Sequence, residues 1–328
     1  MSLSSIASAY ANSQESKKAA EVFKKALLVT SSIDESHLQV SALSAISRSS
    51  GNLQDPQQAS EVIKIAFSLA RSIDSADSLI FKVGVLRNLI ESSGNLPDPE
   101  KAAELLKIAL DIAEKSESLY EIKLVLSSIA KASGNLQDRE KGGELLDMTL
   151  DVVKTIKFPI NEEIGFLNDL VLVLSAISKA YGNLQDPQNA INILMDAIYI
   201  FGESNDLPLA INEEAFISII QASGNLQDSE KSAYLLKAFS NVIQQLKESN
   251  HKASFLIAIA EAYGNIRNSA QGASLLLSAF QTAQKIDNPY SKTETLINIA
   301  RVYKKLNIWK PMLEIRHKCP TKECEVDI

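Results

Sequence analysis

A six-residue phrase, Gly-Asn-Leu-Gln-Asp-Pro at residues 182–187, recurs along the chain and constrains its fold more than any other feature. Close copies begin at Gly51, Gly94, Gly134, Gly224 and Gly264, and degenerate copies begin at Ala11 and Lys304. The eight starting positions 11, 51, 94, 134, 182, 224, 264 and 304 are therefore 40 to 48 residues apart. Self-similarity at such a period indicates a repeat array. In an array of this kind each unit packs on its neighbours rather than around one central core.

The residues of the phrase suit a junction between two helices. A glycine after a helical run can adopt the left-handed conformation that ends a helix. Asp followed by Pro is typical of a helix start, because the Asp side chain accepts hydrogen bonds from free backbone N–H groups and Pro fits the first position. The expected N-cap residues are Asp55, Asp98, Asp138, Asp186, Asp228 and Asn268. The phrase therefore predicts a helix stop, a turn and a helix start in each repeat.

Apolar residues on both sides of each turn recur at three- and four-residue steps, which is the helical period. We expect a helix A before each turn, at residues 3–10, 36–50, 78–93, 119–133, 163–181, 212–223, 251–263 and 291–304. A helix B should follow each turn, at residues 15–32, 56–73, 99–115, 139–156, 187–203, 229–248 and 268–286. The predicted fold is all-α, an α–α superhelix of about seven to eight antiparallel helix pairs. It should occupy residues 1–306, followed by a C-terminal capping segment and tail at 307–328.

Composition and the absence of known motifs narrow the function. The net charge of −7 argues against nucleic acid as a partner, since phosphate binding needs a basic surface. Without a disulfide framework, a signal peptide or an apolar run of about 20 residues, we expect a cytoplasmic protein with no membrane contact. No nucleotide-binding or catalytic motif is present, so we expect no enzyme activity and no cofactor. The spacing of His317, Cys319 and Cys324 matches no zinc half-site, so we expect no metal either.

Two further rows of residues follow the expected helix starts. The residue four positions after each start is small: Ala19, Ala59, Ala102, Gly142, Ala190, Ser232 and Gly272. The residue four positions later is bulky: Phe23, Ile63, Leu106, Leu146, Leu194, Leu236 and Leu276. With Ala180 and Tyr181 before the turn, this pattern resembles the tetratricopeptide (TPR) repeat, and the wording of the turn also resembles SEL-type repeats. The period exceeds the 34 residues usual for TPR, which implies longer helices.

The resemblance implies that the A helices line a concave surface on which partners bind. Two rows of A-helix residues and a repeated Asn should face it: Arg48, Arg87, Glu91, Lys131, Lys179, Gln221, Glu261, Ile217, Ile257, Ile297, Asn135 and Asn183. The N-terminal half of these rows is basic and the C-terminal half carries an isoleucine stripe. We hypothesise a non-enzymatic protein–protein interaction scaffold that binds a peptide or protein segment lengthwise. The acidic or carboxylate end of that segment would lie on the basic half, where charge-assisted hydrogen bonds are strong.

Other interpretations stay open. The charged row can be an ordinary solvated face, the isoleucines can belong to the core between repeats, and the repeated Asn can serve turn geometry alone. An RNA-binding helical repeat protein, a self-associating structural protein forming homodimers, and an enzyme with a helical scaffold are the alternative functions.

Overall fold

The structure is a computed structural model that describes residues 3–12, 15–73, 79–156, 163–202, 213–226, 228–244 and 249–307. Every regular element in these ranges is an α-helix. The chain divides into two compact units, residues 1–158 and 159–328. One continuous array over residues 1–306 stays a prediction. The tail with His317, Cys319 and Cys324 lies outside the described residues.

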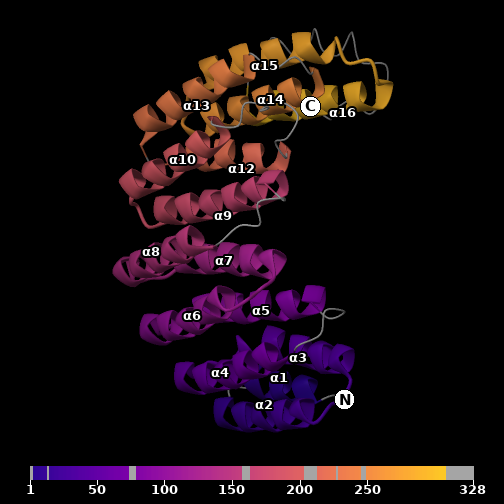
Figure 1. Cartoon of the computed structure of the whole chain (residues 1–328), viewed down its shortest axis with the longest axis vertical. Helices are drawn as coiled ribbons and strands as arrows, with labels where there is room; N and C mark the ends of the chain where they lie inside the picture. The colour runs from indigo at the N-terminus through magenta and orange to yellow at the C-terminus, as the bar shows by residue number, and fades with distance from the viewer. Residues whose placement is uncertain are drawn as a thin grey trace. The chain divides into compact units, whose positions relative to one another are not determined.

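Eight helices form the first unit. They are α1 (Leu3–Asn12), α2 (Ser16–Ser31), α3 (Ser36–Ser50), α4 (Pro56–Ser72), α5 (Leu79–Gly94), α6 (Pro99–Glu114), α7 (Leu119–Ser133) and α8 (Arg139–Thr155). The A helices α1, α3, α5 and α7 pack on one another in that order, and the B helices α2, α4, α6 and α8 do the same. Figure 1 shows α3, α5 and α7 stacked on one side of this unit and α4, α6 and α8 on the other.

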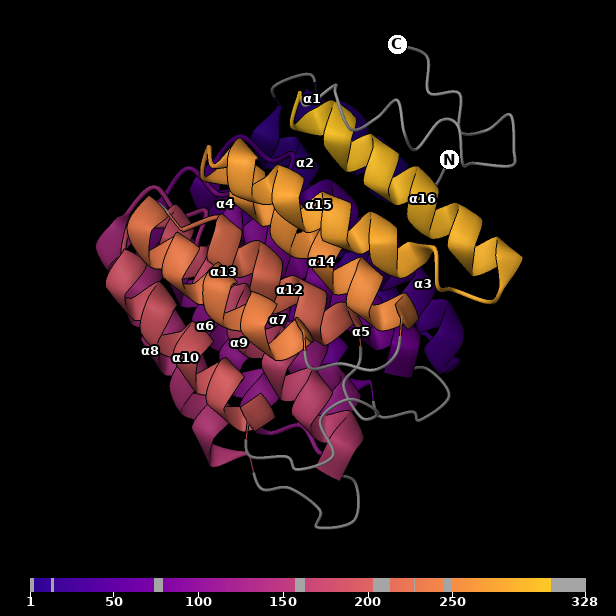
Figure 2. The same ribbon diagram turned by 90° about the horizontal axis from the view of Figure 1, so that it is seen from above.

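The A helices of the second unit stack in the same way. Its described helices are α9 (Glu163–Asn183), α10 (Pro187–Gly202), α12 (Glu213–Gly224), α13 (Ser229–Gln244), α14 (Ser249–Asn265), α15 (Ser269–Ala283) and α16 (Pro289–Lys305). The A helices α9, α12, α14 and α16 contact one another in order. Figure 2 shows α14, α15 and α16 running alongside one another. All fifteen helices expected from the sequence are present, so the all-α helical repeat architecture is confirmed within the described residues.

The two rows of residues that follow each turn form the core. All seven bulky residues, from Phe23 on α2 to Leu276 on α15, have 0% of their surface exposed, and the seven small residues are buried as well. Small side chains let two helix backbones approach closely, while the bulky row fills the space between repeats at the density of a protein interior. None of the described helices combines the length and the apolar character that crossing a bilayer requires.

The predicted helix starts are confirmed at all six positions. Asp55 accepts hydrogen bonds from the backbone N–H groups of Gln57 at 2.9 Å and Gln58 at 3.3 Å. The side chains of Asp98, Asp138, Asp186, Asp228 and Asn268 accept equivalent bonds at the starts of α6, α8, α10, α13 and α15. Each of these side chains satisfies donors that the first helical turn leaves without a partner.

The glycine that opens each turn has a different role from the one expected. No described glycine has a positive φ, and Gly51 and Gly134 have the right-handed φ values of −64° and −67°. The constraint is instead steric. A Cβ added to Gly94 would lie 2.8 Å from Cβ of Ala132 on the next A helix, and one added to Gly224 would lie 2.5 Å from Cβ of Ala262. At Gly94 and Gly224 the glycine therefore permits close approach of successive A helices, whereas a Cβ on Gly182 would find its nearest neighbour, the carbonyl oxygen of Asn225, at 3.7 Å.

The residue before the glycine separates two kinds of turn. Where it is Tyr181 or Tyr263, the helix continues past the glycine and the left-handed residue is Gln185 (φ 63°) or Arg267 (φ 60°). The N–H of Asp186 then donates to the carbonyl of Tyr181 at 2.9 Å. Where the preceding residue is Ser, the helix ends at that Ser or at the glycine, as at Ser50, Gly94, Ser133 and Gly224.

Candidate functional site

The first unit contains a cavity of about 690 Å³ on its A helices. One face of α5 forms its floor: Ile80, Phe81, Gly84, Arg87, Asn88, Glu91, Gly94 and Asn95. These positions recur every three or four residues, so they share one side of the helix from its first turn to its last.

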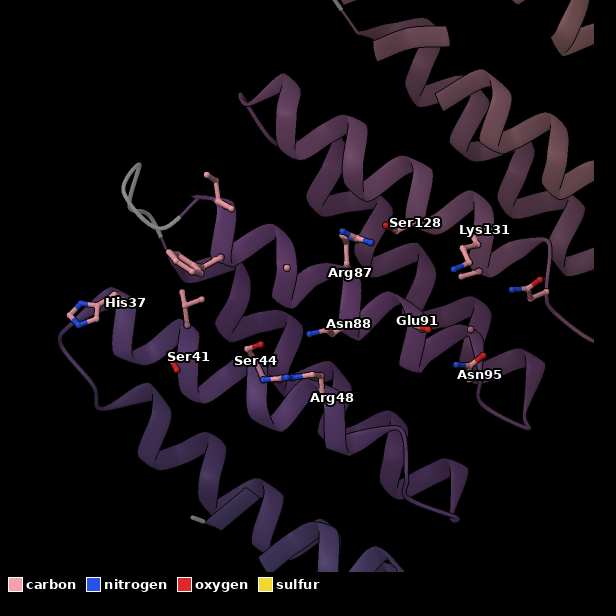
Figure 3. A pocket seen from close by; sticks show the side chains of 17 residues that line it. His37, Ser41, Ser44, Arg48, Arg87, Asn88, Glu91, Asn95, Ser128 and Lys131 are labelled. Carbon is pink, nitrogen blue, oxygen red and sulfur yellow. The ribbon is translucent and has the colours of Figure 1, made fainter. Parts of the chain in front are cut away.

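The neighbouring A helices form the two walls. Helix α3 contributes His37, Val40, Ser41, Ser44 and Arg48, and α7 with its turn contributes Ser128, Lys131, Ala132 and Asn135. Figure 3 shows the labelled side chains of α3, α5 and α7 in three successive rows, with Arg48, Arg87 and Lys131 each on a different helix. The cavity therefore follows α5 and is bounded by one repeat on each side.

Three cations face this cavity without a carboxylate partner. Arg48, Arg87 and Lys131 are exposed, and among the described residues none of them forms an ion pair. The Nε of Arg48 donates to the carbonyl of Ser44 at 3.2 Å. With Glu91 as the single acidic group of the lining, three positive charges and one negative charge give the cavity a net charge of +2 in a chain of −7.

The B helices of the same unit pair their cations across repeats. Lys24 lies 2.6 Å from Glu61, Lys64 lies 2.5 Å from Glu104, and Arg71 lies 3.2 Å from Asp111. Lys141 and Glu100 form a further pair. Exposed pairs of this kind contribute little to stability. Several cations on the B-helix side are thus paired with a neighbouring repeat, whereas none of the three cations of the cavity has such a pair among the described residues.

The structure brings together five of the predicted site residues. Arg48, Arg87, Glu91, Lys131 and Asn135 all line the cavity in the first unit. The remaining seven lie on the A helices of the second unit: Lys179, Asn183, Ile217, Gln221, Ile257, Glu261 and Ile297. Among these, Lys179, Asn183 and Gln221 are exposed, while Glu261 forms an ion pair with Lys305.

The expected isoleucine stripe requires a correction. Ile257 on α14 is only 9% exposed and belongs to the core, and Ile217 and Ile297 are half-buried. Helix α14 contacts α12, α13, α15 and α16, and this packing covers the position that the simple helical count placed toward solvent. The stripe therefore supplies core packing at Ile257 rather than an open apolar surface.

The repeated Asn residues are exposed, and two of them bond to each other. Nδ2 of Asn265 donates to Oδ1 of Asn225 one repeat earlier at 3.2 Å. Asn95 and Asn135 lie at the turn end of the cavity, where they also line a smaller hollow of about 170 Å³. Asn side chains of adjacent repeats can thus contact each other. This contact was expected neither from a role in ligand binding nor from a role in turn geometry.

Sequence reasoning missed part of the cavity. Ile80, Phe81, Gly84 and Asn88 on α5 were not among the expected site residues, although all four line it. The signal was available, because the helical steps that connect Arg87 to Glu91 continue backwards through Gly84 to Ile80. The prediction followed only the last two turns of each A helix.

The family model of the tetratricopeptide repeat matches residues 173–203, which cover the second half of α9 and all of α10. The chain is an all-α helical repeat protein, and one of its repeats matches the TPR model. TPR-like repeats are generally protein-interaction scaffolds, and the fold is typically non-enzymatic. Within the described residues of this TPR-like chain, no group of three or more His, Cys, Asp or Glu side chains could hold a metal ion.

Comparison with solved structures finds matches at low sequence identity. Ton1535 from Thermococcus onnurineus NA1 is 14% identical, with 99% of the TPR-like chain and 97% of that chain covered and a TM-score of 0.34. A circular tandem repeat protein with novel repeat topology is 13% identical, with 96% and 92% covered and a TM-score of 0.46. No curated protein sequence matches the chain.

Proposed function

We propose that this TPR-like protein is a non-enzymatic, cytoplasmic interaction scaffold that binds an acidic peptide or protein segment in the cavity formed by α3, α5 and α7. The observation that carries the proposal is the set of Arg48, Arg87 and Lys131, one cation from each of three successive A helices, without a carboxylate partner among the described residues. An acidic segment would supply the missing carboxylates.

The chemistry of the lining fits such a segment. Arginine forms two parallel hydrogen bonds to a carboxylate, and charge-assisted bonds are about twice as strong as neutral ones. Asn88, Asn95 and Asn135 offer both donors and acceptors, which suit the backbone of an extended chain. Lys179, Asn183 and Gln221 occupy the corresponding exposed positions of the second unit, and we include them in the proposal as further contacts.

A charge-reversal experiment tests this function. The affinity-tagged protein and its Arg48→Glu/Arg87→Glu/Lys131→Glu variant are each incubated with native lysate at low salt, and captured proteins are compared. The matched control is Lys25→Glu/Lys107→Glu/Arg139→Glu, which changes the net charge equally at exposed positions of α2, α6 and α8. We expect the partner to be lost only from the cavity variant. Equal retention by both variants would contradict the proposal.

The same proteins discriminate the RNA alternative. Phosphate contacts give a linear fall of log affinity with log salt concentration, with a slope close to the number of neutralised phosphates. If the protein binds single-stranded oligo(U) with a steep salt dependence and the cavity variant does not, the ligand of the cavity is RNA and not an acidic peptide. Light scattering of the purified protein tests homodimerisation.

A further inference from the structure

Gly84 is the residue of the cavity that the packing of the protein does not explain. It lies in the interior of α5, where glycine is less favourable than alanine. A Cβ added to Gly84 would find no heavy atom within 4 Å. Unlike Gly94 at the end of the same helix, Gly84 is therefore not required by a close neighbour. Its effect is to leave the cavity floor without a side chain one turn after Ile80.

Two exposed apolar side chains stand one turn before this gap. Ile80 is 69% exposed and Phe81 is 63% exposed, and both line the cavity with Gly84. A single exposed apolar residue is ordinary. Two of them beside a helix position without a side chain make an apolar recess, at the opposite end of α5 from Glu91 and Asn95.

The length of the cavity suits an extended chain. Its lining runs along α5 and its turn from Ile80 to Asn95, which is about 22 Å at 1.5 Å per residue. An extended segment of about seven residues spans this length at about 3.3 Å per residue.

We propose that α5 seats one extended segment of a partner protein that runs along this helix, between α3 and α7. An aromatic or aliphatic side chain of the segment lies over Gly84 against Ile80 and Phe81, and its acidic side chains lie toward Arg48, Arg87 and Lys131. Along α5, Arg87 lies about 4.5 Å beyond Gly84. Arg48 and Lys131 occupy the repeat position of Glu91, which lies about 10 Å beyond Gly84. At about 3.3 Å per residue, the acidic residues follow the apolar one by two or three positions. The inference rests on the proposed function and specifies its ligand.

Two labelled peptides serve as probes. The first is Ser-Phe-Ser-Glu-Glu-Ser-Ser with blocked ends, made also in reverse order because the direction of the segment is open. The second replaces its Phe by Ser. Fluorescence anisotropy at low salt should show at least about tenfold tighter binding of the Phe peptide in one of the two orders, because the aromatic ring is removed from water.

Gly84→Leu should remove this advantage by filling the recess, while leaving the weaker binding of the Ser peptide unchanged. Gly143→Leu is the matched control, since Gly143 also lies within a helix, α8, with no heavy atom within 4 Å of an added Cβ, but does not line the cavity. Gly84→Ala and Gly143→Ala should each raise the melting temperature by about 1–3 °C, which shows that the position tolerates a side chain.

The outcomes separate this inference from the proposed function. Equal affinity for the two peptides, lost in the Arg48→Glu/Arg87→Glu/Lys131→Glu variant, would overturn the recess while the acidic-segment function stands. Absence of binding by either peptide up to 1 mM would overturn both. A dimer seen by light scattering that dissociates in Gly84→Leu would assign the groove to a second copy of the chain and overturn the foreign segment as its occupant.

Discussion

Gly94 at the end of α5 lies against Ala132 of α7 so closely that a Cβ on the glycine would be 2.8 Å from Cβ and 3.2 Å from Cα of the alanine. Because this contact involves backbone atoms and the methyl group of Ala132, no side-chain rotation can relieve it. The contact joins two successive repeats, and the same relationship holds between Gly224 and Ala262 in the second unit.

Gly94→Ala should therefore destabilise the protein by about 1–3 kcal/mol, as overpacking does. Gly84→Ala in the same helix is the control and should stabilise it by about 0.5–1 kcal/mol, since its Cβ meets nothing and glycine is a poor helix former. Urea unfolding followed by circular dichroism measures both. Changes of the same sign would show that the contact at Ala132 is not the cause.

Asp55→Ala should cost about 0.5–2 kcal/mol, because two N–H groups at the start of α4 lose their acceptor. Asp55→Asn keeps an oxygen at the same place and should be nearly neutral. The difference between the two variants in urea midpoint isolates the capping bond. A similar loss in both would point to the charge of Asp55 instead.

The stability contributed by Asp98 should depend on pH. Its hydrogen bonds with the Lys101 side chain and backbone lower the pKa of the Asp98 carboxyl below its ordinary value. A lowered folded-state pKa gives stability that is present above the unfolded pKa of about 3.9 and lost as the pH falls through the folded value. Unfolding midpoints of the wild type and Asp98→Asn should therefore differ at pH 6 and converge in strong acid. A difference that persists unchanged to pH 2 would contradict this.

The ion pair between Lys82 of α5 and Glu121 of α7 should matter more than the exposed pairs. Their side chains are only 16% and 5% exposed, Nζ of Lys82 lies 3.4 Å from Oε1 of Glu121, and Ser116 donates to Oε2 at 2.9 Å. Glu121→Ala should cost about 3 kcal/mol because it leaves a largely buried ammonium without its partner.

The double variant Lys82→Met/Glu121→Leu should recover most of that loss, since an apolar pair of similar size removes both charges. Thermal unfolding of the two variants makes the comparison. If the double variant is no more stable than Glu121→Ala, desolvation of the unpaired Lys82 is not the source of the loss.

Leu194→Ala should destabilise the protein by about 2–5 kcal/mol, because this side chain of α10 is fully buried and its removal leaves a cavity. The adjacent Met195 is 44% exposed, so Met195→Ala is the control and should change the stability by less than about 0.5 kcal/mol. Equal effects would mean that the bulky row is not the core of the repeat.

The helices and their capping residues followed from the sequence because they depend on local chemistry. An apolar period of 3.6 residues, an Asp before Pro and a buried row after each cap act within one or two helical turns, and Asp55, Asp98 and Leu194 lie where these rules place them. That Arg48, Glu91 and Lys131 lie along one surface also followed from the sequence, since they occupy the same position of three successive repeats.

The remaining features depend on contacts between repeats, which a local rule does not contain. The role of the turn glycine is set by Ser92, Ala132 and Ala262, each two residues before the next glycine in the chain. Ile257 was placed toward solvent because helical counting ignores the several helices that pack on α14. Gly84 belongs to no repeated motif of the sequence. Its place in the cavity is therefore evident only from the structure, where an added Cβ would have no neighbour within 4 Å.

The fit of Gly94 against Ala132 also limits how freely the repeats can be exchanged. A repeat moved, duplicated or grafted elsewhere in the array brings its glycine to a new neighbour, which must itself be small two residues before its own turn. An engineered version with more or fewer repeats must therefore keep the glycine of one repeat together with the small residue that it contacts in the next repeat.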